Sequence, residues 1–376
     1  MKICIRLFIV LSIYMPSFLF AQQTSGPGTH VHEQARRVVY KLDGFPPGAS
    51  GHIGICSFNI QWLGHWYEKD NQKIALALSP CDVAVIQEMV APPFEVEIMV
   101  KKDEKITIKE DAESRSFFMA MKDHGFDGWL MAPEDTGPNK HHSRSTSSEW
   151  PIVFYKKNKV REAKDLPSGY ISRTRVRHPV FKRVPYAFAL RAAHDSVDFV
   201  LVSVHLSPKN PPDSDHYAKA KRAAEFQLIS KWIKEQKKVN KERDFFVLGD
   251  MNLEDQEEYE AYNGNLSRAI YPHVTAIFRK NKALLGRLKD LSFKSLFIIE
   301  NQKITLFPTN IRLNRPFDHV MYDVKETTIE VYPKVEILDT ARYWQLGGYG
   351  TTRTFIRSYS DHNPIRFQIK KGYDHD

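Results

Sequence analysis

Short hydrophobic runs alternate along the chain with amphipathic segments, a pattern that is typical of an α/β protein. The runs predict buried strands over Ile53–Ile60, Asp82–Gln87, Ile152–Tyr155, Ala187–Ala192, Val197–Val204, Phe245–Leu248, Phe317–Tyr322 and Ile365–Ile369. Hydrophobic residues at helical spacing predict helices over Lys69–Leu78, Tyr217–Lys238, Glu254–Ala261 and Ile277–Leu288. Because a short helix separates the first two strands, we expect those strands to be parallel and joined by a right-handed crossover.

Charged and polar segments interrupt this pattern. Phe94–Ser116 is charged and contains the alternating run Lys105–Lys109, which predicts an insertion with a hairpin strand. Pro133–Ser148 is rich in Ser, His and Gly and predicts a mobile loop. The chain has no internal repeat, so we expect a single domain over residues 51–371 with insertions, rather than two domains.

The N-terminus has the composition of a secretory signal peptide. Two basic residues precede the hydrophobic run Leu7–Phe20, and the small residue Ala21 follows it. A membrane anchor is the alternative, but the run is short for a span and contains Pro16. We therefore expect a signal peptide over 1–21 and a polar leader over 22–50 with at most one strand (Arg37–Leu42). The mature protein is expected to be secreted or periplasmic, without integral membrane association.

Composition and charge narrow the class of partner. The chain is 42% hydrophobic and 26% charged, as expected for a globular protein with a full core. The formal net charge is +9, and loss of Lys2 and Arg6 with the signal leaves +7. A positive exported protein favours polyanions such as nucleic acid, or anionic membranes, although solubility alone also explains the charge.

Two cysteines remain once Cys4 leaves with the signal. If Asn59 and Glu88 lie at one sheet edge, Cys56 and Cys81 are offset by about four residues, or ~13 Å along extended strands. That separation exceeds the reach of a disulfide. The sequence therefore predicts two free, buried thiols.

Polar residues cluster where several of the predicted strands end. Five clusters follow in order, namely Phe58-Asn59-Ile60, Gln87-Glu88, His205, Gly249-Asp250-Met251-Asn252 and Ser360-Asp361-His362-Asn363-Pro364. Carboxylate oxygens at one rim of a sheet can hold a hard divalent cation, and imidazoles can contact or protonate a phosphate. The order and the residue types indicate a metal-dependent phosphodiester hydrolase.

Two histidine–carboxylate pairs are expected at this rim. Asp318 precedes a strand and is a candidate to bond one ring nitrogen of His362, leaving the other nitrogen for a scissile phosphate. Glu149 is the expected partner of His205. Two such pairs facing each other suit phosphate hydrolysis, because one can act on water and the other on the leaving oxygen.

The motifs together resemble the endonuclease/exonuclease/phosphatase superfamily, and deoxyribonuclease I in particular, from about Ile53 to Ile369. The resemblance implies a four-layer sandwich of two packed mixed β-sheets flanked by helices. It implies metal ligation by Glu88, Asn59 and Asp361, and catalytic roles for His205, Glu149, His362, Asp318, Asp250 and Asn252. Arg183 matches an arginine that touches DNA phosphate in the deoxyribonuclease I branch.

The residues that read the substrate depart from that branch. Met89-Val90-Ala91 follows Glu88, where deoxyribonuclease I carries an arginine, and Ser147 replaces a tyrosine. Arg173, Arg175 and Arg177 alternate and would form a phosphate-tracking stripe on an extended segment, or merely a solvated strand face. The aromatics Trp62, Trp66 and Tyr67 are candidates for base stacking, or form a lid over the core.

These observations predict an exported, monomeric, Mg²⁺-dependent DNA endonuclease, with Mn²⁺ or Ca²⁺ as other possible ions. Mg²⁺ is preferred over zinc because the candidate ligands are mostly oxygens and the chain has no cysteine cluster. One alternative is a sphingomyelinase-type phosphodiesterase or phosphatase acting on a lipid headgroup or small phosphate ester. The other is a non-catalytic, toxin-like binding module that kept the fold.

Overall fold

The structure is a computed structural model that describes the chain from Gly51 onward, with gaps. The longest gaps are 133–148, 259–275, 278–292, 296–308 and 341–351. The predicted signal peptide, the leader and the loop Pro133–Ser148 lie outside the described residues. So do most of the two helices predicted over Glu254–Ala261 and Ile277–Leu288. No described helix is long and apolar enough to cross a membrane.

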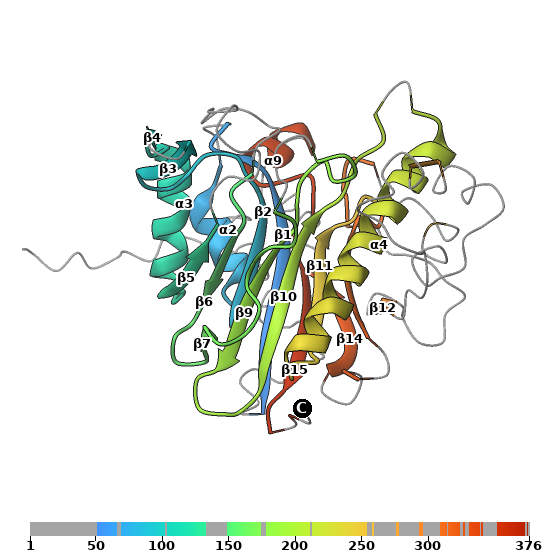
Figure 1. The fold of residues 1–376 in the computed structure, drawn as a ribbon. Coiled ribbons are helices and arrows are strands. Elements are labelled where there is room, and N and C mark those ends of the chain that lie inside the picture. The colour runs from blue at the N-terminus through green and yellow to red at the C-terminus, as the bar shows by residue number, and fades with distance from the viewer. Residues whose placement is uncertain are drawn as a thin grey trace, which may run out of the picture.

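Two mixed β-sheets form the centre of the molecule (Figure 1). The first has the order β14 (Val331–Ile337), β15 (Ile365–Lys370), β1 (His52–Leu63), β2 (Val83–Met89), β6 (Ile152–Tyr155) and β5 (Gly128–Met131). The second has the order β12 (Phe293–Ser295), β13 (Asp318–Asp323), β11 (Phe245–Asp250), β10 (Asp198–His205), β9 (Tyr186–Ala192) and β7 (Val160–Glu162), with β8 (Gly169–Tyr170) beside β9.

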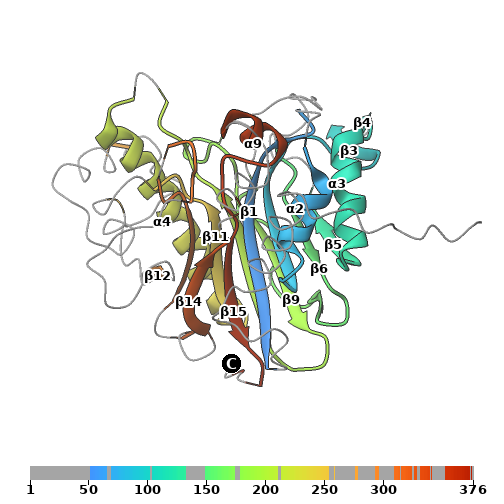
Figure 2. The same ribbon diagram turned by 180° about the vertical axis from the view of Figure 1, so that it is seen from behind.

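Three hydrophobic clusters hold the layers together. One fills the space between the two sheets. A second packs α2 (Asn71–Leu78), α3 (Ala112–Asp123) and α9 (Thr352–Ser358) on the outer face of the first sheet. A third packs α4 (Asp215–Val239) on the second sheet. Figure 2 shows the helices on opposite outer faces. The predicted four-layer sandwich is therefore confirmed.

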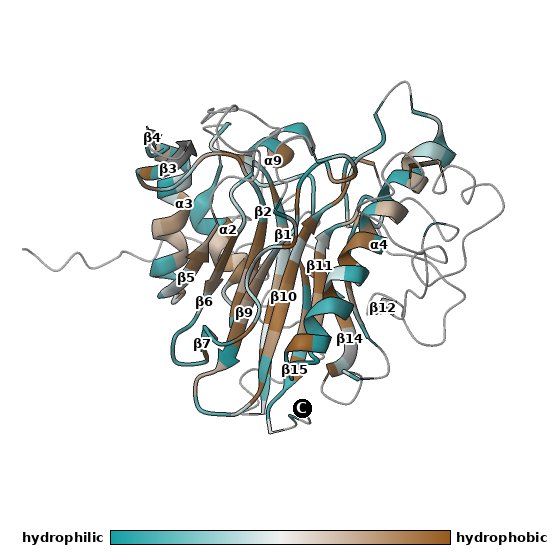
Figure 3. Cartoon of the chain, viewed as in Figure 1, coloured by the Kyte–Doolittle hydropathy of each residue, from teal (hydrophilic) through white to brown (hydrophobic). Residues whose placement is uncertain are grey.

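The central strands are continuous hydrophobic runs in the sequence because both of their faces are buried. All seven residues of β2 are buried, and Figure 3 shows the hydrophobic strands inside and polar residues on the outer side of α4. β1 pairs with β2 in parallel, as the crossover predicted. The charged insertion contains the expected hairpin, formed by β3 (Val96–Lys101) and β4 (Glu104–Ile108).

The prediction of two free thiols was wrong, because Cys56 and Cys81 form a disulfide with a Cα–Cα distance of 5.9 Å. The estimate treated Cys81 as part of an extended strand. The chain instead turns after α2, where the Cys81 N–H donates to the Leu78 carbonyl, and β2 begins only at Val83. The turn brings Cys81 back beside β1.

Removing this disulfide is expected to destabilise the protein. The bond spans 25 residues of sequence, and a native disulfide typically contributes about 2–4 kcal/mol by restricting the unfolded chain. The double variant Cys56→Ala/Cys81→Ala should lose about that much free energy of unfolding, measured by urea denaturation. Wild type in a reductant should approach the variant. An unchanged unfolding midpoint in both cases would contradict the pairing.

Candidate active site

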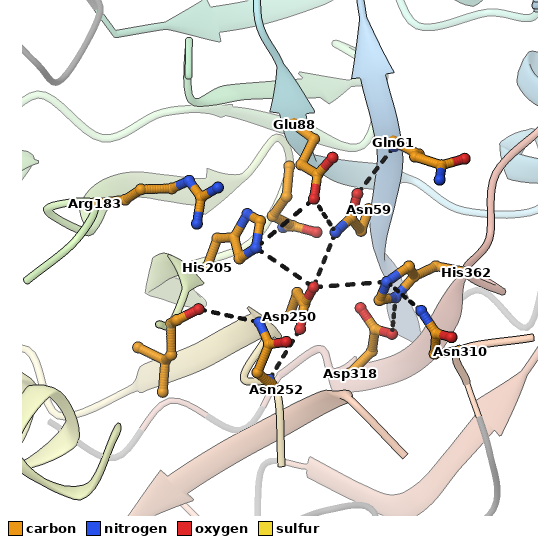
Figure 4. Close-up of polar contacts among 12 residues, drawn as sticks. Asn59, Gln61, Glu88, Arg183, His205, Asp250, Asn252, Asn310, Asp318 and His362 are labelled. Atoms are coloured by element: carbon orange, nitrogen blue, oxygen red, sulfur yellow. Dashed lines mark hydrogen bonds and ion pairs between the residues drawn. The ribbon is translucent and has the colours of Figure 1, made fainter. Parts of the chain in front are cut away.

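The site lies where the parallel strands of both sheets end (Figure 4). β1 and β2 run in parallel in the first sheet, and β10 and β11 run in parallel in the second. Parallel strands deliver their last residues to one edge, and the packing of the two sheets brings these two edges together. Four of the five polar clusters predicted from sequence therefore meet from four different strands, and the fifth reaches the same edge just before β15.

Asp250 occupies the centre of the site. Its Oδ2 lies 3.6 Å from Nε2 of His205 and 3.6 Å from Nε2 of His362. The same oxygen accepts a hydrogen bond of 2.9 Å from Nδ2 of Asn59. Gly249 makes this placement possible, since it has φ +138° and a Cβ there would lie 2.1 Å from the Val204 carbonyl oxygen.

His205 forms one arm of the site together with Glu149. Nδ1 of His205 lies 2.7 Å from Oε1 of Glu149, which also forms an ion pair of 2.5 Å with Nε of Arg183. Burial opposes ionisation of Glu149, but Arg183 and His205 outweigh it and lower the pKa of Glu149 to about 2. Burial and Arg183 lower the pKa of His205, while Glu149 and Asp250 raise it, and the net shift is upward. Glu149 thus stays ionised and fixes the ring.

His362 forms the other arm together with Asp318. Its Nδ1 lies 2.6 Å from Oδ2 of Asp318, which is fully buried. Burial lowers the pKa of His362, but the carboxylates of Asp318 and Asp250 raise it well above the usual value. Both predicted histidine–carboxylate pairs are therefore present in the structure, with each Nε2 left facing Asp250.

Asn310 also contacts His362 and was not found from the sequence. Its Nδ2 lies 2.9 Å from Nε2 of His362, and its Oδ1 accepts the N–H of Leu313 at 2.8 Å. The second contact fixes which amide atom faces the ring, so the neutral ring accepts at Nε2 and carries its proton on Nδ1, toward Asp318. Asn310 sits in an irregular turn, which has no periodic signal in the sequence.

One described group of side chains could hold a metal, and it includes Glu88 from the predicted ligands. Ligand atoms of Glu88, His205 and Asp250 lie within 4.8 Å of one another. Asn59, predicted as a ligand, uses its oxygen to accept the Gln61 N–H and donates through Nδ2 to Glu88 and Asp250, both at 2.9 Å. It therefore bridges the carboxylates. Asp361, also predicted as a ligand, lies farther out, with Oδ1 3.9 Å from Nε2 of His362.

The backbone is strained around these residues. The described non-glycine residues with positive φ are Gln61, Trp62, Glu88 and Asn252, with φ between 50° and 60°. Each costs about 1–3 kcal/mol, and all four lie at this site. The strain is held by hydrogen bonds to the site itself, since Asn252 N–H donates to Asp250 Oδ1 at 2.9 Å and Trp62 N–H to Glu88 Oε2 at 3.1 Å.

Helix α4 supports the site from behind through Glu225, which the sequence analysis missed. This fully buried carboxylate accepts the N–H of Lys182 at 3.1 Å and the N–H of Ser207 at 2.8 Å. Lys182 precedes Arg183, and Ser207 follows His205 by two residues. Glu225 thereby ties both loops of the first arm to one helix. Asn252 also holds the loop after His205, because its Nδ2 donates to the Leu206 carbonyl at 3.0 Å.

The structure describes two of the four predicted substrate-binding arginines, Arg173 and Arg183. Arg183 is buried against Glu149, so it holds that acid rather than presenting its charge on the surface. Arg173 is exposed after β8, while Arg175 and Arg177 lie outside the described residues. Residues 171–173 and 178–185 form no strand, so the described part of this segment does not provide the extended face that was expected.

Comparison of the chain with known proteins finds similarity among solved structures. No family model and no curated protein matches the sequence. Solved structures similar to the chain include the human Nocturnin catalytic domain, 13% identical, covering 86% of this chain and 99% of that one with a TM-score of 0.47. An endonuclease/exonuclease/phosphatase from Bacteroides vulgatus is 13% identical, with coverage of 85% and 99% and a TM-score of 0.47.

A third similar structure is D. rerio TDP2 complexed with single-strand DNA product, 13% identical, with coverage of 85% and 98% and a TM-score of 0.42. At these identities the likeness concerns the arrangement of the chain. Two mixed sheets with flanking helices and a site at their common edge are what the resemblance to the endonuclease/exonuclease/phosphatase superfamily implied. The roles given to the residues rest on the contacts in this chain.

Proposed function

We propose that this protein is an exported, Mg²⁺-dependent endonuclease that hydrolyses phosphodiester bonds of DNA. One observation carries the proposal. Two buried imidazoles, each held by a carboxylate at Nδ1, present their Nε2 atoms to the same oxygen of Asp250 at 3.6 Å. That arrangement suits two proton-transfer groups that act on one reaction centre.

The surrounding charges suit a divalent cation. Glu88, Asp250, Asp318 and Glu149 are all buried, while the nearby cations Arg183 and Lys69 are engaged by Glu149 and by the Tyr359 carbonyl. Burial and the nearby Glu149 raise the pKa of Glu88, as expected for excess negative charge in a closed site. The carboxylates of Glu88 and Asp250 would hold the ion, with Asp361 approaching from the rim, and Nε2 of His205 would remain for the reaction. A bound Mg²⁺ would polarise the phosphate and neutralise the charge that develops on it.

The two arms have complementary roles in the proposed reaction. In its neutral form, His362 accepts at Nε2 a proton from the attacking water, which takes the place of the Asn310 amide there, and the water oxygen forms a bond to phosphorus. The bond from phosphorus to the leaving oxygen breaks, and Nε2 of His205 stabilises or protonates that oxygen. Asp318 and Glu149 hold each ring in the required tautomer and stabilise its charged form. Asn252 completes the site beside Asp250.

Export and a nucleic-acid substrate are supported by features outside the site. The N-terminal segment has the composition of a signal peptide, and a buried disulfide suits an oxidising compartment. The positive charge of the mature chain favours a polyanion. The motif resemblance to deoxyribonuclease I points to DNA.

A panel of phosphodiesters tests this proposal. The mature protein with Mg²⁺ should nick supercoiled plasmid much faster than it hydrolyses bis(p-nitrophenyl) phosphate, and should leave sphingomyelin vesicles intact. EDTA should abolish the nicking. Hydrolysis of sphingomyelin in preference to plasmid would replace DNA with a lipid headgroup as the substrate. Inactivity toward every substrate in the panel would overturn the proposal that the protein is a phosphodiester hydrolase.

A further inference from the structure

Trp62 stands at the rim of the candidate active site, within the strained C-terminal end of β1. Its backbone N–H donates to Oε2 of Glu88 at 3.1 Å, so the residue adjoins the proposed metal site directly. The side chain is half-buried. In the described part of the chain, none of the three hydrophobic clusters that hold the layers together includes Trp62.

The position of Trp62 is fixed by the site. Gln61 and Trp62 both have φ 53°, a conformation that non-glycine residues seldom adopt. The Gln61 N–H donates to Oδ1 of Asn59 at 2.9 Å, and the Trp62 carbonyl accepts the N–H of His65 at 2.9 Å. The indole meets the His65 ring edge-on, with centroids 6.3 Å apart. The strained backbone therefore fixes Trp62 next to Glu88, with its indole against the His65 ring.

We propose that Trp62 stacks on a nucleobase next to the scissile phosphate and so favours nucleic acid over phosphodiesters that lack a planar group. The inference rests on the proposed function and names the group that reads its substrate. Stacking on an indole is possible for every base, so it selects nucleic acid without selecting a sequence. It also supplies a contact that the predicted arginines do not supply within the described structure.

Two matched substrates test the inference. Each is a short single DNA strand in which one linkage is a phosphodiester and all others are methylphosphonates, and the cleavable linkage is flanked either by bases or by abasic residues. For Trp62→Ala, KM for the base-bearing strand should rise roughly tenfold, while kcat and the KM for the abasic strand change little. Trp62→Phe should restore most of the difference.

Trp129→Ala is the matched control, because Trp129 is an exposed tryptophan on β5 at the outer edge of the first sheet. It should leave the KM ratio of the two strands unchanged. If Trp62→Ala leaves that ratio at the wild-type value while the wild type cleaves both strands, stacking by Trp62 is overturned and the nuclease assignment stands. If the wild type cleaves neither strand with Mg²⁺, the proposed function falls and this inference falls with it.

Discussion

Replacing His362 with alanine should lower kcat for plasmid cleavage by about a thousandfold while KM changes little. A positioned acid or base typically contributes about 10²- to 10⁴-fold, and Nε2 of His362 faces the centre of the site with Nδ1 held by Asp318 at 2.6 Å. Asp318→Asn should cost a similar factor, because an amide can hold the ring in the wrong tautomer. Steady-state kinetics measure both effects.

His205→Ala should show a comparable loss, since the two arms act on opposite sides of one bond. His194→Ala is the matched control, because His194 is exposed in the turn between β9 and β10, away from the site. Near-normal turnover in either His205→Ala or His362→Ala, in a variant that folds and binds DNA, would remove that histidine from the reaction.

Glu88→Gln should weaken binding of Mg²⁺ or Mn²⁺ by at least about 100-fold, measured by calorimetric titration. Changing residues that only orient metal ligands already costs about 10–100-fold, and Glu88 is one of the three residues whose ligand atoms converge. The pKa of Glu88 is raised, so the group holds its proton to higher pH, and metal binding must displace that proton. Affinity of the wild type should therefore rise with pH, and this dependence should be weaker in Glu88→Gln.

Glu95→Gln provides the control for that experiment, since Glu95 is exposed just before β3 and the change in charge is the same. Full metal affinity in Glu88→Gln would mean that the ion is held elsewhere. Asp361, which lies farther from the converging group than the sequence implied, would then be the first residue to test.

The sequence was informative where the physical signal is local. The buried strand Ile152–Tyr155 was predicted with its exact bounds. A short apolar run between polar or turn-forming residues is most simply explained as a buried strand. The pairing of His362 with Asp318 followed from the motif resemblance. Helix α3 was missed although its signal was present, with Asp111 capping the first turn and Phe117, Ala120 and Met121 at helical spacing.

Other features depend on how distant segments meet, and no periodicity encodes that. The disulfide depends on a turn at Cys81 that an extended-strand estimate ignored. Asn310 reaches His362 from an irregular turn, and Glu225 reaches Ser207 from a helix that otherwise reads as a simple amphipathic segment. The side-chain oxygen of Asn59 was expected to bind a metal. In the structure it instead accepts a hydrogen bond from the backbone N–H of Gln61, a residue with strained backbone.

Nicking of supercoiled plasmid by the mature protein tests the central claim most directly, with wild type and His205→Ala compared in Mg²⁺ and in EDTA. The account predicts nicking by wild type in Mg²⁺ that is lost in EDTA and falls by about a thousandfold in the variant. Equal nicking by wild type and His205→Ala, or nicking that persists in EDTA, would contradict a metal-dependent hydrolase built on these two histidine–carboxylate pairs.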